Sequence, residues 1–262
     1  MFAQLSQIVH YREAARLLAQ RELQVRYSNS ALGVVWSLLH PLAVTAFFSL
    51  VFSVMLPSPI QRYPVFFLAG LLPWNFFSLS VTVSTSVITN NSQLVNRVRF
   101  PREILPLAVV AANAANYLVA LVPLALLMLF YQVPFTLALA WLPALILVQI
   151  VLTYGVGLAT AALNVYFRDV QQVIEVLMLP LFFLTLGPVL YSGQVTEDSP
   201  LRQILQVANP MAGLVALYQD VFYFGRLPDL SLLGLLAVEA LVVLLIGLVI
   251  FRRLSPYFVD EL

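Results

Sequence analysis

The sequence contains no cysteine and no lysine, and its thirteen basic residues are all arginine. Without cysteine it can form no disulfide, no thiolate nucleophile and no cysteine-ligated metal site. Without lysine it can form neither a P-loop lysine nor a Schiff base, so this chain does not hydrolyse ATP by the P-loop route. Its two histidines, His10 and His40, lie far apart and match no metal-site spacing.

Charge is also scarce. Charged residues make up 10% of the chain and hydrophobic residues 61%, whereas about 25% of the residues of a soluble domain are charged. The mean hydropathy of +0.94 agrees with this bias. A soluble core cannot bury so much apolar surface, so the composition predicts an all-α polytopic membrane protein.

The apolar residues are grouped in runs long enough to cross a bilayer, which takes roughly 20 residues per helix. Six transmembrane helices are predicted, at residues 35–56, 65–89, 104–131, 137–163, 173–191 and 230–251. A shorter run from Pro210 to Phe224 is interrupted by Gln219 and Asp220. It is predicted to be a re-entrant external segment, although an amphipathic loop helix fits the sequence equally well.

The N-terminal residues 1–33 carry arginines throughout and contain no continuous apolar run, so no cleaved signal peptide is expected. A partial helical stripe predicts an amphipathic helix on the inner leaflet, formed by Tyr11, Ala14, Ala15, Leu18 and Val25. The predicted organisation is a cytoplasmic interface segment, 1–33, followed by one membrane domain, 34–262, with an external loop at 192–229.

Five segments of the sequence stand out in order. The first is RELQVRYSNSALG at 21–33, which leads through Trp36 to His40 and Pro41. The others are GLLPWNFF at 70–77, LNVYFRDV at 163–170, NPM at 209–211 and LSPYFVDEL at 254–262. Together they resemble the membrane subunits of type-2 ABC exporters for polysaccharides. That family includes Wzm-like O-antigen permeases, TagG-like teichoic-acid permeases and KpsM-like capsule permeases.

The resemblance implies a homodimeric transport subunit, not an enzyme, in the bacterial inner membrane. Each copy would bind a separate cytoplasmic ATPase subunit, which holds the ATP and Mg²⁺, so no cofactor is expected in this chain. The implied cargo is a glycan linked to polyprenyl pyrophosphate, and O-antigen is the favoured polymer. Capsule polymer, teichoic acid, drugs and small lipids are the alternative cargoes, and no nucleic-acid partner is expected.

Two other classes of protein fit the residues less well. A proton-coupled transporter needs an intramembrane relay, but Glu239 has no acidic or histidine partner at matching depth in another predicted span. An intramembrane enzyme acting on polyprenyl lipid needs a cluster of acidic, histidine or basic residues at one depth, and the sequence contains none.

The loop after the second predicted span, residues 92–103, is short and basic. Ser92 is expected to cap a short helix with an apolar face, and in the resembled family this position is the coupling helix that enters a cleft of the ATPase. An anchor to anionic lipid explains the arginines equally well but the apolar face less well. The residues assigned to ATPase coupling are Leu94, Val95, Arg97, Val98, Arg99, Arg102, Arg168 and Asp169. Arg168 and Asp169 lie on the other short cytoplasmic loop, where pairing with each other is the alternative.

Two further groups are assigned to the cargo. Arg26 and Tyr27 precede the first span at headgroup depth and could recognise pyrophosphate, or could simply anchor the chain at the interface. Sugars stack on aromatic rings, and the rings assigned to a channel or gate are Trp74, Phe76, Phe77, Tyr191, Phe222, Tyr223 and Phe224. A lipid-facing aromatic belt is the alternative for each of them.

The arginines predict the orientation, because cytoplasmic loops of membrane proteins are rich in basic residues. With a cytoplasmic N-terminus, ten arginines fall inside and three fall outside. Both termini should therefore be cytoplasmic. Reporter fusions after Gln194 and after Leu262 should report opposite sides of the membrane, and equal signals from the two fusions would refute this topology.

Overall fold

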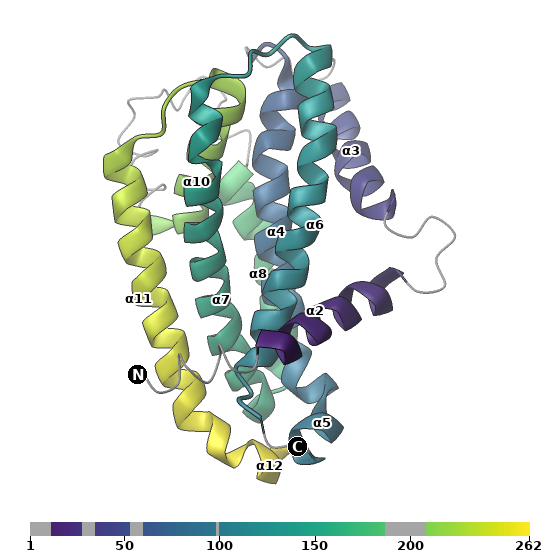
Figure 1. The fold of residues 1–262 in the computed structure, drawn as a ribbon, viewed down its shortest axis with the longest axis vertical. Coiled ribbons are helices and arrows are strands. Elements are labelled where there is room, and N and C mark those ends of the chain that lie inside the picture. Colours follow the sequence, from purple (N-terminus) through teal and green to yellow (C-terminus); the bar gives the residue numbers. More distant parts are fainter. Residues whose placement is uncertain (1–11, 28–34, 53–59, 98–99, 187–207) are drawn as a thin grey trace.

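The computed structural model describes residues 12–27, 35–52, 60–97, 100–186 and 208–262. Every element within these ranges is helical (Figure 1), so the predicted all-α membrane fold is confirmed. The elements are α2 (Arg12–Tyr27), α3 (Val35–Leu50), α4 (Tyr63–Asn90), α5 (Ser92–Arg97), α6 (Ile104–Phe130), the 3-10 helix η2 (Leu137–Trp141), α7 (Leu142–Tyr166), α8 (Asp169–Leu186), α10 (Pro210–Gln219), the π-helix η4 (Asp220–Phe224), α11 (Leu230–Leu254), the 3-10 helix η5 (Ser255–Tyr257) and α12 (Phe258–Glu261).

Five helices of the described part are long and apolar enough to cross a membrane. Three of them are α4, α6 and α8. The other two are α7 joined to η2, and α11 joined to η5 and α12. The predicted first span corresponds to α3, which has 16 residues and ends at Leu50. That is shorter than a bilayer requires, and part of the predicted range lies outside the described residues, so the sixth span stays a prediction.

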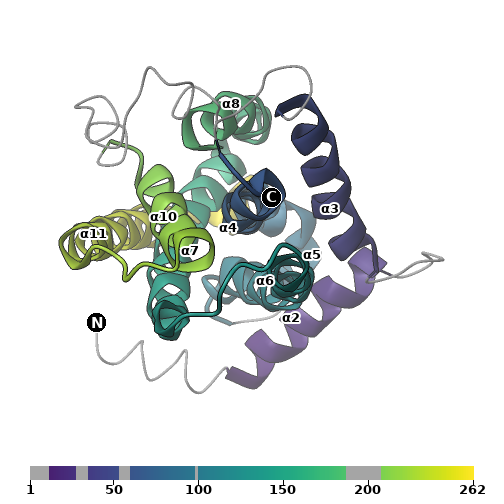
Figure 2. The ribbon, with the colours of Figure 1, turned by 90° about the horizontal axis from the view of Figure 1, so that it is seen from above.

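The central helix is α4, which is surrounded by α3, α6, α7, α8 and α10 (Figure 2). Of its most apolar stretch 78% is buried, compared with 11% for α8, which lies at the periphery. The second half of α4 is rich in Ser and Thr, and two of these hydroxyls donate back to helix carbonyls. Thr85 Oγ1 donates to the Val81 carbonyl at 2.8 Å, and Thr89 Oγ1 to the Ser86 carbonyl at 2.9 Å. Such bonds satisfy polar groups inside the membrane.

Helices α7 and α11 cross in close backbone contact at two glycines. A Cβ atom on Gly247 would overlap the carbonyl oxygen of Gly155, and one on Gly155 would lie 2.6 Å from the backbone nitrogen of Leu244. Helices in a membrane gain little from apolar contact with each other compared with lipid, so close backbone approach is a main source of their packing energy. These glycines permit that approach.

The segment predicted to be re-entrant forms α10 and η4, which are packed among the helices. Asn209 caps α10 by accepting the Met211 N–H at 3.2 Å, and its Nδ2 donates to Thr185 Oγ1 of α8 at 2.9 Å. At the other end of α10, Gln219 Nε2 donates to the Phe66 carbonyl of α4 at 3.3 Å. The segment thus lies alongside the first turns of α4, while its depth in a bilayer stays a prediction.

The bundle has two distinct ends. One, here called the α5 end, carries α5, the turn between α7 and α8, η5 and α12 (Figure 1). The other, the η4 end, carries η4 and η2, where Tyr223 of η4 donates from its hydroxyl to the Gln61 carbonyl before α4. The segments predicted to be cytoplasmic therefore gather at the α5 end. In the described part, α2 also lies there, across α6, where Leu18 packs against the local core.

The glycine crossing generates a test of the fold. Gly247→Ala should lower the melting temperature of the purified chain, because overpacking a tight contact costs about 1–3 kcal/mol. Gly234→Ala is the matched control on the same helix, since a Cβ there meets nothing within 4 Å. The control should be neutral or slightly stabilising, because alanine favours helix by about 1 kcal/mol. Equal melting temperatures for the two variants would contradict the close crossing.

Candidate functional site

The short helix α5 is joined to the bundle through Asn91. The Asn91 carbonyl accepts the backbone N–H groups of Leu94 at 2.9 Å and Val95 at 3.0 Å, so Asn91 opens α5. Its Nδ2 donates to the Val87 carbonyl at 2.8 Å, and its Oδ1 accepts from Arg21 of α2 at 3.4 Å. The expectation that Ser92 caps this helix is therefore wrong, because Ser92 is already its first residue.

The apolar face of α5 points into its own chain. Val95 is only 3% exposed and belongs to the core of the α5 end, and Leu94 packs against the same cluster. The side chains that remain exposed are Gln93, Asn96 and Arg97. Because the apolar face attaches α5 to the bundle, a protein that contacts this helix meets a polar surface with one positive charge.

Arg102 connects the loop after α5 to the C-terminal hook, the name used here for residues 255–262. Its guanidinium donates from Nη1 to the Ser255 carbonyl and lies 5.8 Å from the centre of the Phe258 ring. Phe258 is fully buried and packs edge-on against Phe251 of α11, with ring centres 5.4 Å apart. Arg102 is thus committed to a contact within the chain.

The end of α7 contacts the last residue of α11, directly before the hook. The Tyr166 hydroxyl donates to the Leu254 carbonyl at 3.0 Å, which joins the end of α7 to the end of α11. Asn164 Oδ1 accepts the backbone N–H of Gln171 at 3.1 Å and so shapes the turn. Arg168 and Asp169 are both exposed, and in the described part no ion pair joins them. The bond from Gln171 to Asn164, and not a pairing of these two charges, is the contact seen to shape the turn.

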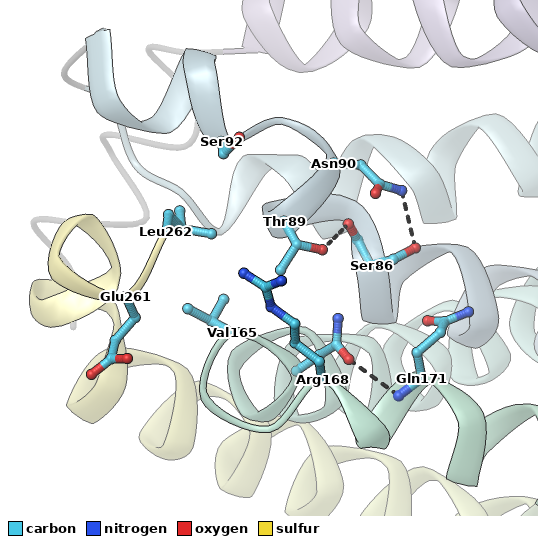
Figure 3. Close-up of a pocket in the computed structure, with 10 residues that line it drawn as sticks. Ser86, Thr89, Asn90, Ser92, Val165, Arg168, Gln171, Glu261 and Leu262 are labelled. Carbon is cyan, nitrogen blue, oxygen red and sulfur yellow. Dashed lines mark hydrogen bonds between the residues drawn. The ribbon is translucent and has the colours of Figure 1, made fainter.

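Two cavities lie beside these contacts. One of about 490 Å³ separates α5 from the hook and is lined by residues that include Arg97, Phe100, Arg102 and Val259. The other, of about 390 Å³, lies between the end of α4, the turn after α7 and the end of the hook (Figure 3). Both volumes fall within the range of ligand pockets in proteins, roughly 300–1,000 Å³.

The aromatic residues assigned to a channel or gate are mostly internal. Trp74, Phe76, Phe77 and Phe222 are all buried in the core of one chain. Their neighbours are other rings, as where Phe76 stacks on Tyr117 with centres 5.7 Å apart. A channel lining and a lipid-facing belt both require exposed rings, and for these four the observed surroundings are protein.

The two remaining described rings lie in η4. Tyr223 is partly exposed, and burial raises the pKa of its phenol while the charge of Arg62 opposes the rise, so it stays a hydrogen-bond donor to Gln61. Phe224 is 37% exposed, and the Arg226 guanidinium lies 4.2 Å from its ring centre. Their role at a gate stays a prediction.

Several assigned residues lie outside what the structure describes. Val98, Arg99 and Tyr191 are outside the described residues, and of Arg26 and Tyr27 only the backbone, at the end of α2, is described. Sequence reasoning missed two residues that organise the α5 end, Asn91 and Phe258. No motif of the sequence points to Asn91, and Phe258 belongs to the tail motif at 254–262.

Comparison with known proteins gives consistent results. Residues 13–223 match the family model described as ABC-2 type transporter. The chain is 36% identical to the O-antigen export system permease protein RfbA of Myxococcus xanthus, with 100% of both chains covered. It is 27% identical to a protein of the same name from Klebsiella pneumoniae, over 94% of this chain and 93% of the relative. Identity to the polysialic acid transport protein KpsM of Escherichia coli is 27%, over 88% and 90% of the two chains.

The contacts of Arg102 make a prediction about the hook. Arg102→Gln should raise the hydrogen-exchange rate of residues 255–262 about tenfold or more, because it removes a charge-assisted hydrogen bond. Arg97→Gln makes the same change of charge on an exposed side chain of the same loop and should leave this exchange unchanged. Unaltered exchange in both variants would show that Arg102 does not hold the hook.

Proposed function

The chain belongs to the ABC-2 type transporter family, and on this premise we propose that it is the permease subunit of an exporter that moves lipid-linked polysaccharide across the bacterial inner membrane. The observation that carries the proposal is full-length similarity to permeases named for O-antigen export. O-antigen is therefore the proposed polymer, linked to polyprenyl pyrophosphate.

The chemistry of this chain supports a separate ATPase. It lacks lysine, so it has no P-loop of its own. Intramembrane ion coupling has little support. Glu239 is the only carboxylate of α11, and in the described part no cluster of acidic or histidine residues could hold a metal ion. We assign the energy to a cytoplasmic ABC ATPase bound to each copy.

The position of α4 supports a homodimer. This helix occupies the centre of the chain, where side chains and backbone are closely packed. A hydrated polymer is too wide to pass along such a core, so it must travel outside the single bundle. Two copies facing each other would enclose a conduit, since most oligomers of identical subunits are symmetric dimers.

The proposed ATPase contact is the exposed side of α5, with Gln93, Asn96 and Arg97, at the cytoplasmic end of an N-in and C-in topology. The buried Val95 and the bond from Arg102 to the hook fix α5 to α4 and α11. A displacement of α5 by the ATPase would therefore move α4 and α11 together with it. Asp169 lies exposed at the same end and can extend this contact.

Capsule polysaccharide is the second candidate cargo. The observation in its favour is the similarity to a protein named for polysialic acid transport, which covers 88% of this chain. The O-antigen relatives cover more of the chain, and one of them at higher identity, so O-antigen remains the first candidate. The polymer that is lost from the cell surface when the chain is removed separates the two.

One complementation experiment tests cargo and docking together. A strain without this chain should accumulate lipid-linked polymer in the cytoplasm, and the wild-type chain should restore export. The double variant Asn96→Asp with Arg97→Glu should insert and fold but fail to restore export, because it reverses the charge of the exposed α5 side. The ATPase should no longer co-purify with it.

The control is Arg253→Glu, a charge reversal on an exposed residue at the same end but outside α5. It should retain both the ATPase and export. Substitution of Val95 is unsuitable, because a charge there would be buried in the core and would unfold the α5 end. If the α5 double variant exports polymer and retains the ATPase normally, α5 is not the docking site.

A further inference from the structure

Most of the residues that line the smaller cavity at the α5 end are polar. Hydroxyls come from Ser86, Thr89 and Ser92 at the junction of α4 and α5, and amides come from Asn164 and Gln171 around the turn after α7. Arg168 supplies the positive charge (Figure 3). These groups belong to segments far apart in the sequence, so the fold brings them together.

Arg168 projects into this cavity. Figure 3 shows its guanidinium directed between the end of α4 and the turn after α7. The Glu261 carboxylate also belongs to the cavity wall, but it points away from Arg168 in the same view. In the described part of the chain no carbonyl or carboxylate accepts a hydrogen bond from Arg168. A guanidinium has five N–H donors, so its donors here are free for a ligand.

The neighbouring hydrogen bonds direct further donors into the cavity. Asn164 Oδ1 is occupied by the Gln171 N–H, which leaves the Asn164 Nδ2 amide free to donate. Ser86 Oγ accepts from Asn90 Nδ2 at 3.2 Å, so the Ser86 hydroxyl retains its own proton for donation. Gln171 Nε2 bonds to Glu175 Oε1 at 2.6 Å and keeps that carboxylate one turn up α8. The cavity therefore presents the Ser86 hydroxyl, the Asn164 amide and the Arg168 cation, with the Glu261 carboxylate in its wall and the Thr89 hydroxyl already donating to the Ser86 carbonyl.

We propose that this cavity binds the phosphate group of an amphiphile at the cytoplasmic end of the permease. Arginine matches phosphate oxygens with two parallel N–H bonds, and hydroxyl and amide donors can complete the contact. A volume of about 390 Å³ is ample for a diphosphate group. The hydrocarbon part has a place too, because α8 leads from the cavity along the bundle with Val173 and Val176 exposed.

This inference rests on the proposed function in one respect: the phosphate would be that of the lipid carrier of the polymer. An anionic membrane phospholipid has the same chemistry at its headgroup and is the other source. The two differ in the number of phosphates and in the chain attached to them. Competition between defined ligands can therefore distinguish them without a transport assay.

The test is equilibrium binding of radiolabelled farnesyl diphosphate to the full-length chain in phosphatidylcholine nanodiscs. Arg168→Gln should weaken binding about 10- to 100-fold, the effect of losing a hydrogen-bonded charge. Arg168→Lys should give an intermediate loss, because lysine keeps the charge but not the planar fork. Arg253→Gln removes an exposed arginine at the same end outside the cavity and should bind as the wild type does.

Unlabelled competitors assign the source. Strong competition by phosphatidylglycerol would assign the site to bulk anionic lipid. Competition by inorganic diphosphate, with no competition by phosphatidylglycerol, would assign the site to the carrier diphosphate. Equal binding by Arg168→Gln and wild type, or equal binding of farnesol, would overturn the proposal. So would an Arg168→Gln variant that loses the ATPase and keeps diphosphate binding, because the cavity would then be a docking surface. None of these results bears on export itself, which the complementation experiment tests.

Discussion

The fold depends on how tightly other helices can approach α4. Contact with lipid is as favourable as contact with another apolar helix, so the bundle needs either close backbone approach or interhelical hydrogen bonds. Both occur along α4. Gly70 leaves room for α10 to approach, Gln149 Nε2 of α7 donates to the Pro73 carbonyl at 2.7 Å, and Gly157 of α7 lies against Ser84. These contacts lie at successive levels and fix the register of α7 along α4.

The α5 end is a consequence of that register. Once α4 and α7 are aligned, the junction at Asn91 and the turn at Asn164 lie at the same end, and the close crossing with α11 brings the hook to it. Arg102 and Tyr166 then bond to adjacent carbonyls, those of Ser255 and Leu254. Two loops and the hook therefore share one hydrogen-bonded structure. A movement of α5 relative to the bundle must either break these bonds or move the hook with it.

Sequence reasoning predicted the class of fold and the family because both depend on features that are local in the sequence. Runs of apolar residues identify spanning helices, and short motifs such as the one at Asn209 and Pro210 specify local turns, here the cap of α10. It could not predict what each apolar face contacts. Leu94 and Val95 share a helical face, but the period is the same whether that face meets a partner, lipid or the chain's own core.

The aromatic residues show the same limit. Trp74, Phe76 and Phe77 lie close together in a strongly apolar helix, and hydropathy does not distinguish rings that face lipid from rings that face protein. The reason that they are internal lies in distant residues, since Tyr117 of α6 and Phe182 of α8 provide the partners.

The same packing decides how a gate in η4 could work. Phe76 stacks on Tyr117, Tyr117 meets Tyr218 of α10 edge-on at 6.1 Å, and Tyr218 stacks on Phe222 at 6.4 Å. Phe222 is therefore the last of a row of rings that links α4 and α6 to η4, and it cannot move without them. Truncating Phe222 would disturb packing before it disturbed any gate. Of the described rings assigned to a gate, Tyr223 and Phe224 reach the surface, so these two are where a role in gating can be tested separately from stability.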